Sequence, residues 1–114
     1  IDTDTLVVGA RKLNSDTGAA YVFTRSGTSW SQQAKLTGSD ATTNDNFGWS
    51  VDISGDTIVV GSKSASSGST TYVGAVYIYT RSGTSWSQQA KLSPACMSED
   101  CIFFTCVHEV PERV

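Results

Sequence analysis

The chain has 114 residues with a formal net charge of −3, and only 17% of its residues are charged. No basic patch appears, which argues against a nucleic-acid partner. No apolar run approaches the ~20 residues that a membrane-spanning helix needs, and residues 1–4 lack the basic start and apolar core of a signal peptide. Ser, Thr and Gly are abundant, a composition that favours β-strands joined by tight turns over long helices.

An internal repeat runs through most of the chain, and a period of about 50 residues is typical of propellers and related repeat folds. The longest repeated segment is identical in its two copies, and the other two are similar. Each is made of strand-forming residues, so the repeat unit is expected to be a set of β-strands. The matching segments are 4–10 with 56–62 at an offset of 52, 18–23 with 74–79 at an offset of 56, and 24–36 with 80–92 at an offset of 56.

The two copies differ in extent. Residues 1–36 have no counterpart of the strand that we predict at 48–54, so they are expected to form a partial first blade, whereas 37–92 form a complete second blade. The change of offset places four extra residues of the second copy in its Ser-rich and Gly-rich stretch, 63–73. An insertion confined to such a stretch marks a surface loop. The remaining residues, 93–114, are expected to be a divergent tail.

Four strands are predicted in the second copy. Val51 and Ile53 alternate with polar residues in the first of them, and Trp86, Ala90 and Leu92 share one parity in the last. Gly55 can take the positive φ that the first hairpin turn requires, and a second short hairpin is expected at 81–84. The predicted strands are 48–54, 57–62, 74–80 and 85–92.

The predicted fold is all-β, with four-stranded antiparallel meanders that form about two blades of an incomplete β-propeller. A sandwich or a solenoid of hairpins is the alternative. The two central strands carry apolar residues on both parities, as Ile58 and Val59 illustrate. Sheets stacked face to face bury both faces of their central strands, which favours the propeller.

The motifs Phe47-Gly48, Gly61-Ser62 and Gly74-Ala75, in this order and with the duplication, resemble FG-GAP repeat proteins, the family that includes the integrin α-subunit propeller. The resemblance covers residues 1–92, although the "GAP" element is degraded to Gly9-Ala10-Arg11 in the first copy and to Gly61-Ser62-Lys63 in the second. It implies an extracellular or cell-surface module for adhesion or for binding a protein or carbohydrate through inter-blade loops. It also implies further blades of the same parent chain, or self-association.

Many FG-GAP blades resemble calcium-binding hairpins with several carboxylates between their first two strands. Here the corresponding turn is Ser54-Gly55-Asp56, with one carboxylate. Calcium takes six to eight oxygen ligands, so we expect no calcium at this turn, and we predict no metal and no cofactor for the chain.

Four residues are candidate ligand contacts. Asp40, Asn44 and Asp45 crowd the connection that precedes Phe47 and could bind a cation, but Asx residues also shape turns, and their spacing matches no EF-hand register. Trp49 lies next to the expected innermost strand, where it could face the central channel or serve in packing.

Aromatic residues recur at equivalent positions of the two copies. They could form a sugar-stacking surface, but a residue kept in every repeat is more often used for packing between repeats. We therefore predict inter-blade packing. The residues concerned are Tyr21, Trp30, Tyr77, Tyr79 and Trp86.

The tail holds Cys96, Cys101, Cys106 and His108, which include all the cysteines and the only histidine. Their spacing is more even and longer than that of structural zinc sites. Cys106 and His108 could pair as nucleophile and base, but no orienting group or oxyanion hole is identifiable for them. A capping segment, the start of another domain and a gene-model artefact all remain open as origins of this tail.

The binding module is predicted to be non-enzymatic. The alternative is the scaffold portion of a propeller enzyme, of hydrolase or lyase type, with its catalytic residues outside this fragment. The first two strands of the second copy and their turn offer only Asp52 and Asp56 as acidic groups. Because repeat units bury their faces only against neighbours, the isolated chain is expected to self-associate or aggregate.

Overall fold

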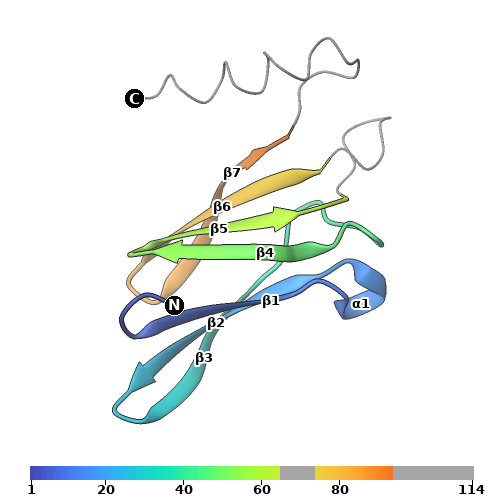
Figure 1. Ribbon diagram of the computed structural model, residues 1–114. Helices are drawn as coiled ribbons and strands as arrows, with labels where there is room; N and C mark the ends of the chain where they lie inside the picture. Colours follow the sequence, from blue (N-terminus) through green and yellow to red (C-terminus); the bar gives the residue numbers. More distant parts are fainter. Residues whose placement is uncertain (65–73, 94–114) are drawn as a thin grey trace.

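The computed structural model describes residues 1–64 and 74–93, and these contain seven β-strands in two antiparallel sheets (Figure 1). The predicted all-β fold class is confirmed, and each sheet is a meander of consecutive strands. Within the described ranges, no helix is long and apolar enough to cross a membrane. The first sheet consists of β1 (Thr5–Ala10), β2 (Ala19–Ser26) and β3 (Ser29–Leu36), and the second of β4 (Phe47–Ser54), β5 (Thr57–Ser62), β6 (Ala75–Ser82) and β7 (Ser85–Leu92).

The strand boundaries agree closely with the sequence pattern. β5 and β7 have the predicted bounds, β4 begins one residue early at Phe47, and β6 is shifted toward its hairpin and ends at Ser82. Gly55 has a φ of 57° in the β4–β5 turn, as predicted for that hairpin. The division into 1–36, 37–92 and 93–114 stays a prediction.

The two sheets pack face to face, and the core lies between them. Val7 and Val22 of the first sheet are buried against a layer of buried side chains from the second. Alternation along each strand places these residues on one face. The second sheet contributes Phe47, Ile53, Ile58, Val60, Tyr77 and Tyr79 to this core, and Ala20 and Leu36 complete the part from the first sheet.

The start of β4 fits into the first sheet, and β1 and β4 lie side by side (Figure 1). The Phe47 N–H donates to the carbonyl of Thr17 at 3.0 Å, and Gly18 and Phe47 form a parallel bridge. The Gly48 carbonyl lies against Gly9, where a Cβ atom would collide with it. Glycine is needed at position 9 because backbone occupies the space of a side chain.

The β1–β2 connection contains a short helical segment, α1 (Leu13–Asp16). Asn14 and Ser15 both have a φ of 58°, in the left-handed region, so α1 is an irregular turn and not a regular right-handed helix. The Ser15 and Asp16 carbonyls accept hydrogen bonds from the backbone N–H groups of Asn44 and Asn46. This turn therefore joins the β1–β2 connection to the β3–β4 connection.

A β-bulge in the last strand of each sheet corrects one prediction. Ala90 pairs with Ile78 and Gln88 pairs with Tyr79, so Gln89 is an extra residue. The extra residue places Trp86 on the face toward the first sheet, whereas Ala90 and Leu92 lie on the opposite face. The prediction that Trp86, Ala90 and Leu92 share a face is therefore wrong.

The central strands β5 and β6 were expected to be buried on both faces, but in the described structure only the face toward the first sheet is buried. Val59 of β5 and Val76 of β6 are 38% and 36% exposed, because they point away from the first sheet. Val8 is likewise exposed on the outer face of the first sheet. Each sheet thus keeps one face open in the described structure.

Candidate functional site

The longer connections gather at one end of the two sheets, here called the loop end. It consists of residues 11–18, 37–46 and 63–64, which follow β1, β3 and β5. The tight hairpin turns at Gly27, Gly55 and Gly83 lie at the opposite end, called the hairpin end. Figure 1 shows α1 and the start of β4 together at the loop end. Ligand-binding residues of repeat folds are most often found on such connections.

Trp49, one of the predicted contact residues, is 42% exposed at the loop end. The Arg11 guanidinium carbon lies 4.3 Å from the centroid of its ring, and the Lys63 ammonium nitrogen lies 4.0 Å from it. Cations at this distance are attracted by the electrons of the indole ring. The cluster of Arg11, Trp49 and Lys63 is therefore an aromatic surface with two positive charges.

Arg11 and Lys63 were not predicted as site residues, although a signal exists in the sequence. Arg11 directly follows β1, and Lys63 directly follows β5, at the repeat offset of 52. Both copies thus place a cation after the equivalent strand. The pairing of β5 with β4 brings Lys63 to Trp49 within the second sheet, and the docking of β4 beside β1 adds Arg11 from the first sheet.

Asp40, the second predicted residue, joins the β3–β4 connection to the second sheet. Its carboxylate accepts hydrogen bonds from the Tyr77 hydroxyl at 2.7 Å and from the Lys91 ammonium at 2.6 Å. The hydrogen bond from Lys91, and next that from Tyr77, lowers the pKa of the Asp40 carboxyl. Burial, and next the hydrogen bond to Asp40, raises the pKa of the Tyr77 phenol. The carboxylate is therefore held in an ion pair.

This ion pair predicts an acid-sensitive contribution to stability. A lowered pKa means that the folded chain favours the carboxylate, so Asp40 stabilises the fold above the ordinary carboxyl pKa of 3.8. The contribution is lost as the pH falls from there through the folded-state value. We expect Asp40→Asn to lower the free energy of unfolding near neutral pH. We also expect the urea midpoint of this variant to fall less than that of the wild type between neutral and acidic pH.

The matched control for this pH experiment is Asp52→Asn. Asp52 is exposed on the open face of the second sheet and accepts a hydrogen bond from the next residue, Ile53. Urea midpoints of the wild type and both variants are compared across the acidic range. An unchanged acid dependence in Asp40→Asn would contradict the role of the Lys91 ion pair.

Asp45 and Asn44, the other predicted residues, shape the β3–β4 connection. The buried Asp45 carboxylate accepts hydrogen bonds from the Thr42 N–H at 2.9 Å and the Thr42 hydroxyl at 3.3 Å. The Asp45 carbonyl accepts a hydrogen bond from the Ser62 hydroxyl at 2.9 Å. Asn44 has a φ of 70°. These contacts are the turn chemistry of Asx residues.

The acidic residues within 1–64 and 74–93 are not gathered into one site. In the ranges that the structure describes, no three His, Cys, Asp or Glu side chains come together in a way that could hold a metal ion. In the β4–β5 turn, the Asp56 carboxylate pairs with Arg81 at 2.9 Å. Cys96, Cys101, Cys106 and His108 lie outside the described residues.

Of the five recurring aromatic residues, Tyr77, Tyr79 and Trp86 pack between the sheets, as predicted, whereas Tyr21 and Trp30 lie on the open face of the first sheet. The Trp86 indole N–H donates to the Gln33 side-chain carbonyl of the first sheet at 2.7 Å. Tyr77 and Tyr79 are buried with their rings edge-on to Phe47, at centroid distances of 5.0 and 6.3 Å. Trp30, the equivalent of Trp86, is exposed on the first sheet, beneath the Arg25 guanidinium.

Comparison with known proteins supports the resemblance seen in the sequence. The model of the FG-GAP repeat family matches residues 30–79, a segment that runs from the start of β3 to the middle of β6. No curated protein matches the chain at a significant level. The matched segment contains Phe47-Gly48, the element that joins the two sheets. Residues 30–79 are therefore identified as an FG-GAP repeat, and the two sheets of the chain form a β-propeller-type repeat module.

Proposed function

We propose that this chain is a non-enzymatic binding or adhesion module of an extracellular or cell-surface propeller, which contacts a protein or carbohydrate ligand through its loop end. The observation that carries the proposal is the exposed Trp49 ring with Arg11 and Lys63 against it. The extracellular setting rests on the FG-GAP family alone.

The chemistry of the Trp49 cluster suits recognition. Tryptophan and arginine are enriched among the residues that contribute most to binding energy in protein interfaces. The indole offers a flat apolar face, and the cations of Arg11 and Lys63 favour an acidic group beside it. The ligand class that fits best is therefore a protein segment or sugar that carries a carboxylate or sulfate next to an apolar surface.

The proposal of a non-enzymatic module is supported by the contacts of the carboxylates. Asp56 pairs with Arg81, and its repeat equivalent Asp4 pairs with Arg25 at 2.8 Å. A general acid or base must reach a substrate proton, whereas these side chains hold hairpins together. The competing proposal, a propeller enzyme with its catalytic groups elsewhere in a longer parent, is tested by hydrolase and lyase assays on that parent.

The test of the binding proposal is the variant Trp49→Ala on arrays of acidic glycans and acidic peptides. We expect its affinity for the strongest hit to fall about thirtyfold, the effect of truncating a hot-spot tryptophan. Removal of both cations in Arg11→Ala with Lys63→Ala is expected to weaken the binding and to reduce its salt dependence.

The matched control is Trp30→Ala, measured at a low chain concentration. Trp30 has a similar exposure and also lies beneath a cation, Arg25, but it belongs to the hairpin end. Equal losses for Trp49→Ala and Trp30→Ala would place the ligand elsewhere. Unchanged binding in Trp49→Ala would refute the proposed site.

A further inference from the structure

The interface between the two sheets has two unlike sides. The first sheet contributes a face with small and branched side chains, among them Val7 and Val22, and the second contributes a face with Tyr77 and Tyr79. Such an interface is heterologous, because neither side is complementary to itself. Because the two sheets are repeats of one sequence unit, each sheet has one face that is buried in this interface and one open face that corresponds to the buried face of the other sheet.

The open faces are the repeat counterparts of the two buried ones. Val59 and Ile78 on the open face of the second sheet are equivalent to Val7 and Val22. On the open face of the first sheet, the equivalents of Ile58, Val60, Tyr77 and Tyr79 are Leu6, Val8, Tyr21 and Phe23.

Polar contacts at the hairpin end hold the buried interface in register. Gln33, the bulge residue of β3, accepts hydrogen bonds from the Trp86 indole at 2.7 Å and from the Arg81 guanidinium at 3.3 Å. The same guanidinium donates to the Thr5 hydroxyl at 3.2 Å. We call this set the latch, with Arg81 and Trp86 as its donor half and Thr5 and Gln33 as its acceptor half.

Each half of the latch is present a second time on an open face. Arg25 pairs with Asp4 and lies over Trp30, as Arg81 pairs with Asp56 and lies over Trp86, so the first sheet has a second donor half. The Arg25 side chain is 42% exposed, against 16% for Arg81. Thr57 and Gln89, exposed on the second sheet, are the second acceptor half.

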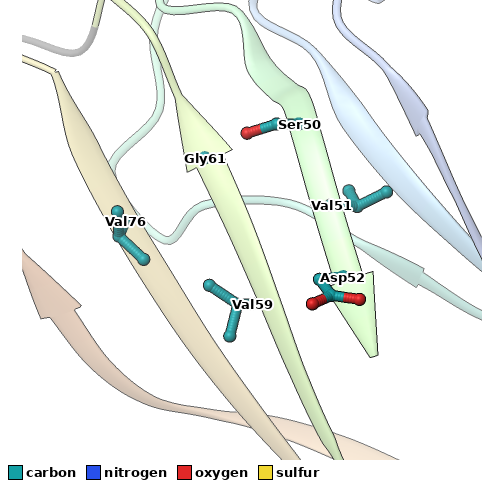
Figure 2. Close-up of a pocket in the computed structure, with 6 residues that line it drawn as sticks. All are labelled: Ser50, Val51, Asp52, Val59, Gly61 and Val76. Atoms are coloured by element: carbon teal, nitrogen blue, oxygen red, sulfur yellow. The ribbon is translucent and has the colours of Figure 1, made fainter. Parts of the chain in front are cut away.

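The open face of the second sheet is also hollowed. A shallow hollow of about 240 Å³ lies on this face, and Ser50, Gly61 and Val76 are among the residues that line it. Figure 2 shows these residues on β4, β5 and β6. Gly61 is the repeat equivalent of Gly9, against which the Gly48 carbonyl packs in the buried interface. The open face thus has the apolar residues and the acceptor half of a surface that receives a sheet, while the Ser50 hydroxyl lies over Gly61 in the place that the Gly48 carbonyl takes over Gly9.

We propose that the open face of the second sheet binds the open face of the first sheet of a second copy of this chain, head to tail. In this contact Arg25 and Trp30 of one molecule donate hydrogen bonds to Gln89 and Thr57 of the other molecule. Because the first sheet has three strands and brings no counterpart of Phe47-Gly48 to the hollow, the contact is smaller than the internal one and reversible. A heterologous contact propagates into open chains unless a ring closes.

The experiment uses two charge variants of the 114-residue chain. Val8→Arg blocks the open face of the first sheet, and Val59→Arg blocks that of the second. Both valines are exposed, so both variants are expected to keep the far-UV circular dichroism of the wild type. In sedimentation velocity, the wild-type mass is expected to grow with concentration, and each variant alone is expected to stay monomeric.

An equimolar mixture of the two variants is the decisive sample. Val8→Arg retains an intact second sheet and Val59→Arg retains an intact first sheet, so the mixture is expected to give one heterodimer and no larger species. A monomeric wild type at high concentration would overturn the proposal. So would a mixture that stays monomeric, because the two intact open faces would then not bind each other. A dimer of either variant alone would mean that like faces join.

The latch has its own test with an internal control. Gln89→Ala is expected to weaken self-association about five- to tenfold, the effect of one lost hydrogen bond. Gln33→Ala is expected to lower the stability of each copy and to leave the association unchanged. Equal association in wild type and Gln89→Ala would refute the latch. None of these residues contacts Trp49 through the interactions described above, so ligand binding at the loop end is judged separately.

Discussion

Phe47→Ala is expected to be the most destabilising single substitution of an apolar side chain, with a loss of about 3–5 kcal/mol in the free energy of unfolding. The Phe47 ring is fully buried, edge-on to Tyr77 and Tyr79, at the point where β4 meets the first sheet. Its removal leaves a cavity that both sheets line. Domains of this size are stable by only about 5–15 kcal/mol, so urea unfolding should show the loss directly.

The matched control is Phe23→Ala. Phe23 lies half-buried on the open face of the first sheet, where solvent replaces the lost ring. We expect it to cost about 1 kcal/mol, since only part of its apolar surface is buried. Similar losses for Phe47→Ala and Phe23→Ala would mean that Phe47 does not lie between the sheets.

Gly9→Ala is expected to lower the free energy of unfolding by about 3 kcal/mol, the upper part of the range for overpacking. The new methyl group would fall on the Gly48 carbonyl, a backbone atom that cannot move without separating β4 from β1. The two sheets would then lose their contact at the loop end.

Gly61→Ala, at the equivalent position of the second repeat, controls for the intrinsic cost of alanine in this strand. There the new methyl group meets the Ser50 hydroxyl oxygen, which can rotate away. We expect a change below about 1 kcal/mol. Thermal and urea unfolding of both variants give the comparison. Equal losses in the free energy of unfolding would show that Gly9 is not covered by the second sheet.

Much of the fold can be predicted because the repeat presents the same strands twice. The identical segments 24–36 and 80–92 contain β3 and β7 together with the hairpin turns before them. Gly27 and Gly83 in these turns both have a φ of 65°. Strand-forming residues between turn residues give a clear signal. Phe47-Gly48 marks the start of β4 because only glycine takes a φ of 91° without strain there.

The bulges at Gln33 and Gln89 could not be predicted. The run Ser-Trp-Ser-Gln-Gln-Ala-Lys-Leu alternates well enough to be interpreted as an uninterrupted strand, and one extra residue reverses the faces that follow it. The bulge depends on the register with β2 or β6, which the strand's own residues do not determine. The bulge is the reason why Trp86 does not share a face with Ala90 and Leu92.

The candidate site could be predicted in part. The turn chemistry at Asp45 follows from local preferences, since its carboxylate binds Thr42, three residues away. The ion pair of Asp40 with Lys91 and the cations at Trp49 arise from long-range packing of strands. Alternation and composition contain no signal for such contacts, and the repeat shows only that a cation follows both β1 and β5.

A double-mutant cycle on Gln33 and Trp86 is the most direct test of how the two sheets dock. In the structure, the face of the first sheet that contains Val7 packs on the face of the second sheet that contains Tyr77. Gln33→Ala and Trp86→Phe each remove one partner of the 2.7 Å hydrogen bond between the sheets. The cycle is measured by urea unfolding at a low chain concentration. The equivalent pair Gln89 and Trp30 is the control, because each of these two lies on an open face.

We predict a coupling free energy of about 1 kcal/mol for Gln33 with Trp86, the net contribution of one such hydrogen bond. For Gln89 with Trp30 in the monomer we predict a coupling indistinguishable from zero. A zero coupling for Gln33 with Trp86, or equal couplings in the two pairs, would contradict the docking of the sheets through these faces.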